Sequence, residues 1–207
     1  ELIQTFTDTA MCSKYGVKPE TMVCLFIPNT YEIYWNITPE KLLERMHEEF
    51  QRYWNDERLA KAKAKGLTPY EVMTVASIVY KETMKAEENP TVAGLYLNRL
   101  EKGMKLQACP TVKFALKDFS LRHILNRHLQ VDNPYNTYKY AGLPPGPICI
   151  PSLNSIEAVL NAVEHDYLYM CAKEDFSGTH NFASTGAEHE ANARKYQRAL
   201  NERGIKK

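Results

Sequence analysis

Thr68–Arg99, TPYEVMTVASIVYKETMKAEENPTVAGLYLNR, predicts two helices separated by a short polar break. Thr68, Pro69 and Glu71 form the pattern of a capping box with proline at the first helical position, so we expect the first helix to begin here. Apolar residues recur at helical spacing at Val72, Val75 and Val79. This periodicity predicts one buried face for the first helix.

Glu82 occupies the next position on that apolar face, where a carboxylate is unusual. Burial beside apolar neighbours would raise its pKa, and the negative end of the helix dipole would act in the same direction. A carboxyl group that stays protonated near neutral pH is what a general acid requires. The alternative is a solvated glutamate at a fraying helix end, which has no chemical role.

Length and composition are those of an ordinary globular domain. The 207 residues include 44% hydrophobic and 25% charged residues, and the formal net charge is +1. This charge gives no electrostatic reason to expect a nucleic-acid partner. Thirteen tyrosines are many for this length and suit a cleft with an aromatic lining, as sugars require.

The chain contains no apolar run near the roughly 20 residues that span a bilayer, and no signal-peptide pattern. It begins with Glu1 rather than methionine, so it can be a fragment of a longer protein. We expect residues 1–25 to be the remnant of an upstream region or linker, and residues 26–207 to form the catalytic domain.

The predicted fold class is α+β, a mainly helical domain with a small antiparallel sheet. Two strands are expected at residues 167–173 and 179–184, joined by the turn EDFSG. Residues 24–38 read as strand or extended chain. Further helices are expected from Thr38 through residue 54 with a continuation to Gly66, from a capping Asn89 to Gly103, from Pro110, from Ser120 through residue 128, from about Asn154 with Glu157 in a capping box, and from Thr185 with Glu188 to near Gly204.

Several familiar catalytic motifs are absent from the sequence. It has no serine-hydrolase elbow, P-loop or dinucleotide fingerprint. The histidines are scattered and show no metal-ligand spacing: His47, His123, His128, His165, His180 and His189. Cys109 could be a thiol nucleophile, but no base is identifiable for it, so we interpret it as structural. We expect no metal and no cofactor.

Polar residues among rigid turns are the better binding candidates. Asn98 and Arg99 end a helical turn, Gln107 precedes a proline-containing segment, and a long structured loop contains Tyr135, Asn136, Thr137 and Tyr138. Amide and hydroxyl groups beside a protonated glutamate would suit a sugar that carries N-acetyl groups. Each residue can equally be a turn former, or can hydrogen-bond its loop to the core.

Six motifs follow one another in the chain: ASIVYKET, AGLYLNRL, GMKLQACPTV, NPYNTY, GLPPGPI and the closing HNF with a later histidine. In this order they resemble the YceG-like family, the endolytic murein transglycosylases. The resemblance runs from about Phe26 to the C-terminal helix and therefore covers most of the chain.

The resemblance implies cleavage of the β-1,4 bond between N-acetylmuramic acid and N-acetylglucosamine within glycan strands, leaving a 1,6-anhydro-muramyl end. The family's catalytic glutamate is the second acid of an ASIxEKE motif, which is Glu82 here, whereas the first acid is replaced by Tyr80. Thr111 and His180 lie in the matching motifs and join the expected substrate-binding residues. One acid is sufficient because the sugar's own 6-hydroxyl replaces water, so no second carboxylate is needed as nucleophile.

The resemblance also implies a location and partners. Family members carry an N-terminal membrane helix, which would place this domain on the extracytoplasmic side of the bacterial plasma membrane, in the cell envelope. Glycan strands of peptidoglycan would be the substrate, and cell-wall synthesis and division proteins would be partners.

Two other function classes are open at this point. With Tyr80 in place of an acid, the chain could be a non-catalytic glycan-binding module of the cell-wall synthesis machinery. An older label of the family is aminodeoxychorismate lyase, a pyridoxal-phosphate enzyme, but no lysine lies in a recognisable cofactor-binding pattern.

Overall fold

The computed structural model describes residues 2–121 and 124–205. Its helices are α1 (Leu2–Thr7), α2 (Thr9–Lys14), α3 (Pro39–Tyr53), α4 (Asp56–Ala64), α5 (Pro69–Glu82), α6 (Asn89–Glu101), α7 (Cys109–Leu116), α8 (Leu153–Leu160) and α9 (Gly186–Glu202). The strands are β1 (Tyr169–Ala172) and β2 (His180–Ala183), and short 3-10 turns are η1 (Met22–Leu25), η2 (Ala86–Glu88) and η3 (His128–Gln130). The predicted class, mainly helical α+β with a small antiparallel sheet, is confirmed.

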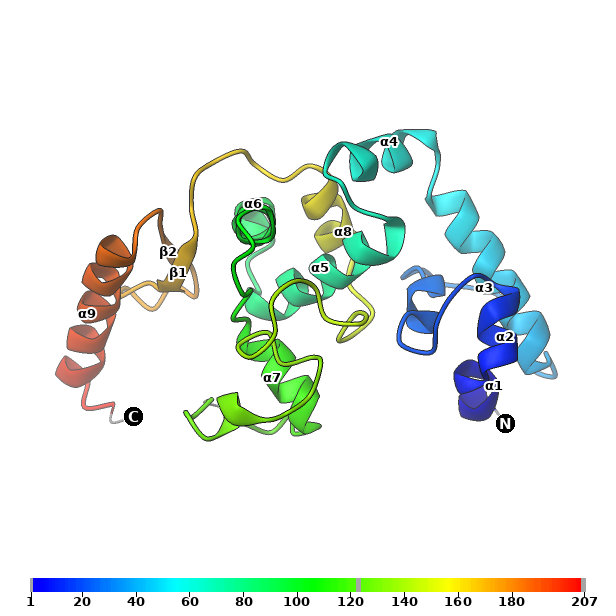
Figure 1. Cartoon of the computed structure of the whole chain (residues 1–207), viewed down its shortest axis with the longest axis horizontal. Helices are drawn as coiled ribbons and strands as arrows, with labels where there is room; N and C mark the ends of the chain where they lie inside the picture. The colour runs from blue at the N-terminus through cyan, green and yellow to red at the C-terminus, as the bar shows by residue number, and fades with distance from the viewer. Residues whose placement is uncertain (1, 122–123, 206–207) are drawn as a thin grey trace.

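Helix α5 is the centre of the molecule, with α6, α7 and α8 packed around it (Figure 1). It begins as predicted, because the backbone N–H of Thr68 donates to Glu71 Oε2 at 2.8 Å and the N–H of Glu71 donates to Thr68 Oγ1 at 3.3 Å. Every residue from 72 to 79 is buried, so the middle of the helix is enclosed on all sides.

Ser77 joins α5 to the proline-rich loop after residue 133. Ser77, fully buried in α5, accepts a hydrogen bond from the backbone N–H of Ile148 at 3.0 Å and donates to Thr74 O. This bond fixes the end of the loop against the helix.

Several predicted helix ends are wrong in detail. The helix from Thr38 does not continue to Gly66 but ends at Tyr53, and Asn55 caps a separate α4 by accepting from the N–H of Arg58 at 3.0 Å. Trp54, the residue that ends α3, is buried. No α-helix covers described residues 120–121 and 124–128 of the helix predicted from Ser120, and residues 122–123 lie outside the described residues.

Two predicted caps are also wrong. Asn89 is the first residue of α6 rather than its cap, and Glu88 occupies the cap position. Ser152 caps α8, and Glu157 instead pairs with Arg58, Oε1 to Nε at 2.7 Å. Long-range contacts with α4 therefore decide the place of Glu157, whereas the capping box of Thr185 and Glu188 at α9 is confirmed.

The two strands form one antiparallel hairpin, with Tyr169 opposite Ala183 and Ala172 opposite His180. Helix α9 covers the hairpin, and the two together form one end of the molecule, opposite the N-terminal helices (Figure 1). Residues 161–168 connect this end to α8 as an extended segment, which we call the strap. The hairpin matters for function because it carries His180.

The N-terminal segment packs onto α3 through α1 and η1. Its buried residues Cys12, Val17, Cys24 and Leu25 belong to the same hydrophobic core as α5. The assignment of residues 1–25 to an upstream region stays a prediction. No helix among the described residues is long and apolar enough to cross a membrane.

Candidate active site

Glu82 is the last residue of α5, and its side chain is partly buried. The hydroxyl of Tyr96, a buried residue of α6, donates a hydrogen bond to Glu82 Oε1 at 2.7 Å. The helix ends here because Thr83 has extended backbone angles. The carboxyl group therefore lies where α5 stops, fixed from the side of α6.

Burial raises the pKa of Glu82 above that of an ordinary glutamate. The hydrogen bond from Tyr96 and the nearby charges of His180 and Lys113 favour the carboxylate, but less strongly than burial opposes it. Burial and the adjacent carboxylate also raise the pKa of Tyr96, so its hydroxyl stays a donor. The arrangement can hold a proton on Glu82 at a pH where most glutamates have lost it.

The carboxyl group borders a pocket of about 640 Å³ between the end of α5, the hairpin and α9. The pocket is lined by Glu82, Thr83, Met84, Lys85, Ala172, Lys173, Phe176, Gly178, Thr179, His180 and Tyr196. Its walls combine aromatic rings, hydroxyls and cationic groups, which suits a polar ligand with apolar faces.

His180 reaches this pocket from β2 and is held there by Glu88. The imidazole Nδ1 lies 2.9 Å from Glu88 Oε2, and the backbone N–H of His180 donates to Glu88 Oε1 at 2.7 Å. Thr83 Oγ1 also donates to Glu88 at 3.1 Å. Glu88 thus joins the end of α5 to the hairpin.

The sequence did not single out Glu88, a residue that the structure buries almost completely. The only signal in the sequence was a second acidic residue before the α6 proline, and such residues are usually solvated.

Cys109 and Tyr138 lie near the same carboxyl group. Their Sγ and Oη atoms are 3.2 Å apart, and the charge of Glu82 contributes to the raised pKa of both. Tyr138 of the predicted loop therefore lies within electrostatic range of Glu82. Cys109 is exposed, but desolvation of its thiol raises the pKa, which disfavours the reactive thiolate.

The side chains of Asn98 and Arg99 form hydrogen bonds within the protein. Asn98 Nδ2 donates to the carbonyls of His165 and Tyr167 at 2.6 and 3.1 Å. Arg99 is buried and donates to Leu168 O at 2.6 Å, to the carbonyls of residues 105 and 106, and to the side chain of Gln107. These bonds fasten the strap and the segment before α7 to α6.

The remaining predicted binding residues fix the loop in place. Thr111 and Thr137 are buried and share a hydrogen bond of 2.8 Å between their hydroxyls, while buried Asn136 donates to the carbonyls of Leu129 and Val131. Tyr135 packs on Phe114, and burial raises the pKa of Tyr135 to about 12. Contact of any of these residues with a substrate stays a prediction.

Gln107 differs from them because it is exposed and has a positive φ of 53°. Its backbone N–H donates to Thr137 O at 3.1 Å, and its side-chain oxygen accepts from Arg99.

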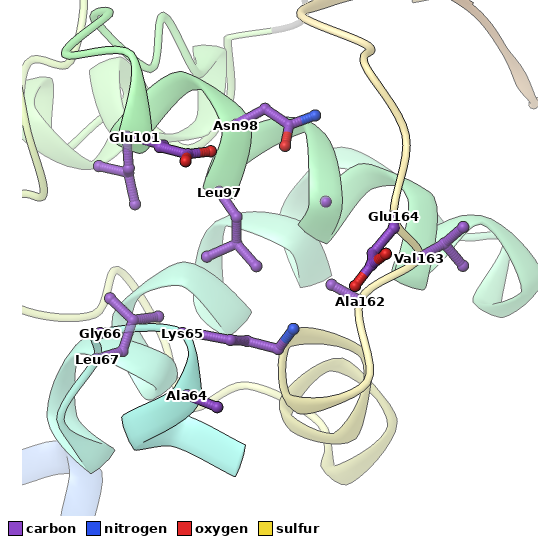
Figure 2. Close-up of a pocket in the computed structure, with 12 residues that line it drawn as sticks. Ala64, Lys65, Gly66, Leu67, Leu97, Asn98, Glu101, Ala162, Val163 and Glu164 are labelled. Atoms are coloured by element: carbon purple, nitrogen blue, oxygen red, sulfur yellow. The ribbon is translucent and has the colours of Figure 1, made fainter.

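A separate pocket of about 490 Å³ lies between the end of α4, α6 and the first strap residues (Figure 2). Lys65, Asn98 and Glu164 line it, and Asn98 is its single residue from the predicted site. Within residues 2–121 and 124–205, no group of three or more His, Cys, Asp or Glu side chains could hold a metal ion; His123 lies outside this range. The pocket beside Glu82 is the candidate site, because it contains the predicted acid Glu82 together with His180.

The sequence model of the YceG-like family matches residues 1–195. A protein of Streptococcus pneumoniae named endolytic murein transglycosylase is 34% identical over 169 residues, which cover 80% of this chain and 30% of that protein. A protein of the same name from Bacillus subtilis is 37% identical over 141 residues, covering 68% of this chain and 38% of that protein. This chain thus spans well under half the length of these two relatives.

A solved structure also resembles the fold. The crystal structure of a yceG-like protein from Listeria monocytogenes superimposes with a TM-score of 0.78 at 28% identity, covering 92% of this chain and 66% of that one.

Proposed function

This chain belongs to the YceG-like family, and we propose that it is the catalytic region of an endolytic peptidoglycan lytic transglycosylase. The observation that carries the proposal is the carboxyl group of Glu82, partly buried, hydrogen-bonded to Tyr96 and open to a pocket. The names of two relatives, endolytic murein transglycosylase, support the substrate class.

In the proposed reaction Glu82 acts first as acid and then as base. Its proton moves to the oxygen that links N-acetylmuramic acid to N-acetylglucosamine, and the bond from this oxygen to the muramyl C1 breaks. The resulting carboxylate accepts the proton of the muramyl 6-hydroxyl as the 6-oxygen bonds to C1. Glu82 regains its proton, no water is consumed, and the products are a free sugar hydroxyl and a 1,6-anhydro end.

Tyr96 and His180 have distinct proposed roles. Tyr96 holds the carboxyl group in place and donates more strongly to the carboxylate that forms between the two steps. His180 presents its imidazole to the pocket, where it can bind a sugar hydroxyl or acetamido oxygen. Tyr138 is proposed as a further substrate contact because it lies close to Glu82.

The other predicted residues are proposed to shape the cleft. Gln107 is exposed, lies two residues before Cys109 in the chain, and can contact the glycan strand directly. The bonded side chains of Asn98, Arg99, Thr111, Tyr135, Asn136 and Thr137 are proposed to position the loops that receive the glycan. In the full-length protein we propose a membrane anchor, an extracytoplasmic location and contacts with cell-wall synthesis proteins.

Analysis of product ends tests this function. Purified glycan strands are incubated with the protein, and the new ends are identified by mass spectrometry. We expect 1,6-anhydro-muramyl ends from within the strands. Reducing muramic ends would show a hydrolase, and binding without turnover would show the glycan-binding module instead.

A further inference from the structure

A second pocket adjoins the candidate active site on the other side of Thr83 and Met84. Its volume is about 540 Å³, close to that of the Glu82 pocket, and the two pockets share these two residues. It is lined by Tyr80, Lys81, Thr83, Met84, Ala86, Asn89, Ser152 and Asn154. A polymer that lies in one pocket can therefore continue into the other.

The pocket has an aromatic wall. Tyr80 is 43% exposed although it belongs to the central helix, whose residues 72–79 are all buried. Met84, which lines both pockets, is fully exposed. Exposed aromatic and thioether groups offer apolar contact to the C–H face of a pyranose ring.

The pocket also contains an unsatisfied polar group. Asn89 is only 6% exposed, and its Oδ1 has no hydrogen-bond partner among the residues that the structure describes. A buried amide oxygen without a donor is unusual, and because this atom is closed to solvent, the Asn89 side chain has to turn toward the pocket before a ligand group can donate to it. The N–H of an acetamido substituent is such a donor, and exposed Asn154 provides a second amide at the same pocket.

Lys81 gives the pocket a positive charge. Its ammonium group lies 5.1 Å from the centre of the Tyr80 ring. The N-terminus of α8, capped by Ser152, adds partial positive charge to the same wall. An anionic substituent is therefore favoured here.

We propose that this pocket is a saccharide subsite for an N-acetylmuramic acid residue of the glycan strand. The acetamido group would meet Asn89 and Asn154, the sugar ring would pack on Tyr80, and the lactyl carboxylate would meet Lys81. The inference rests on the proposed function in one respect, that the strand also passes Glu82. It gives a role to Tyr80, which stands where the family motif has an acid.

Binding measured without turnover tests the subsite. All variants are made in the Glu82→Gln protein, and calorimetry measures their affinity for two peptide-free tetrasaccharides. One tetrasaccharide alternates N-acetylglucosamine and N-acetylmuramic acid, and the other contains N-acetylglucosamine alone. Tyr34→Ala is the matched control, because Tyr34 is 83% exposed and lies outside both pockets.

We expect Tyr80→Ala to weaken binding of both tetrasaccharides about tenfold. Lys81→Gln should weaken binding of the tetrasaccharide that contains N-acetylmuramic acid and leave binding of the other unchanged. Tyr34→Ala should change neither affinity. Circular dichroism confirms folding, and both substituted side chains are exposed enough to be replaced without loss of the core. Unchanged affinities in Tyr80→Ala and Lys81→Gln, or no binding by the Glu82→Gln parent, would overturn the subsite.

The outcome is separable from that of the proposed function. If the wild-type chain releases anhydro ends and the Tyr80 and Lys81 variants bind like their parent, the subsite fails and the function stands. If no cleavage occurs but both variants lose affinity as described, the subsite stands and the function fails.

Discussion

At the scale of single residues, the position of Glu82 is unfavourable for folding stability but useful for the proposed proton transfer. Its carboxyl group costs stability when ionised, because burial raises its pKa more than Tyr96, His180 and Lys113 lower it. The same raised pKa keeps a transferable proton available. Stability and proposed chemistry therefore make opposite demands on this side chain, and the conflict can be measured as a function of pH.

Glu82→Gln should stabilise the protein at neutral pH but not in acid. Below the ordinary glutamate pKa of about 4.3, the carboxyl is neutral in the folded and unfolded chains, so the variant gains nothing. Above it the unfolded chain ionises first, and wild-type stability falls until the pH passes the raised folded pKa. We expect the variant to be more stable than the wild type at pH 7, seen as a Tm higher by about 2–4 °C for each kcal/mol gained.

Thermal melts of both proteins between pH 3 and pH 8 check this. A variant that is less stable than the wild type at pH 7 would contradict the raised pKa.

Glu88 is a positioning residue for His180. The carboxylate accepts from Nδ1, so in the neutral imidazole this nitrogen, rather than Nε2, should carry the proton. Glu88→Gln removes the preference for one tautomer and a charge-assisted hydrogen bond. We expect kcat/KM to fall about tenfold and the imidazole ¹⁵N shifts to report a mixture of tautomers.

Glu87→Gln is the matched control, because Glu87 is the exposed neighbour. It should leave both the tautomer and the rate unchanged. An unaltered tautomer in Glu88→Gln together with a wild-type rate would remove the positioning role.

At the scale of helices and strands, local signals predicted the beginnings of elements well. The capping boxes at Thr68 and Thr185 form as expected, because each is closed by residues only three apart. The break after Tyr53 was not predictable, since it depends on burying Trp54 and on pairing Arg58 with Glu157 about a hundred residues later. Glu157 and Asn89 failed as caps because tertiary contacts decide where α8 and α6 begin.

The contact of α6 with the strap depends on Gly94. A Cβ atom at this position would lie 2.5 Å from the carbonyl oxygen of Val163 and 2.8 Å from His165 Nε2. Gly94→Ala should therefore push the strap away and destabilise the protein by about 1–3 kcal/mol, despite the better helix propensity of alanine. Urea unfolding measures the loss.

Gly186→Ala is the control in the first turn of α9, where no atom lies within 4 Å of the added Cβ and φ is not positive. It should be neutral or stabilising by up to about 1 kcal/mol. Equal stability of the two variants would mean that the close approach at Gly94 is not maintained in solution.

At the scale of the whole molecule, the candidate site exists because the hairpin end returns to the end of α5. The buried side chain of Arg99 binds the carbonyl of residue 168 to α6. The side chain of Glu88, at the end of η2, binds the backbone of His180 to the segment that precedes α6. The sequence predicted the hairpin and the raised pKa of Glu82, but not this closure, because carbonyl acceptors of a buried arginine leave no pattern in a sequence. It also singled out Thr111, Asn136 and Thr137, whose polar groups turn out to be bonded inside the protein.

The most direct test of the central proposal is the rate of glycan-strand cleavage by Glu82→Gln beside Glu71→Gln. Glu71 is a glutamate of the same helix whose carboxylate closes the capping box, so its replacement controls for changes to α5. We expect Glu82→Gln to lose about 10²–10⁴-fold or more, since one group serves both proton transfers, and Glu71→Gln to stay near the wild-type rate. The wild-type pH profile should fall on its basic side at a pH above the ordinary glutamate pKa of about 4.3. A folded Glu82→Gln protein that keeps most of the wild-type cleavage rate would contradict the account.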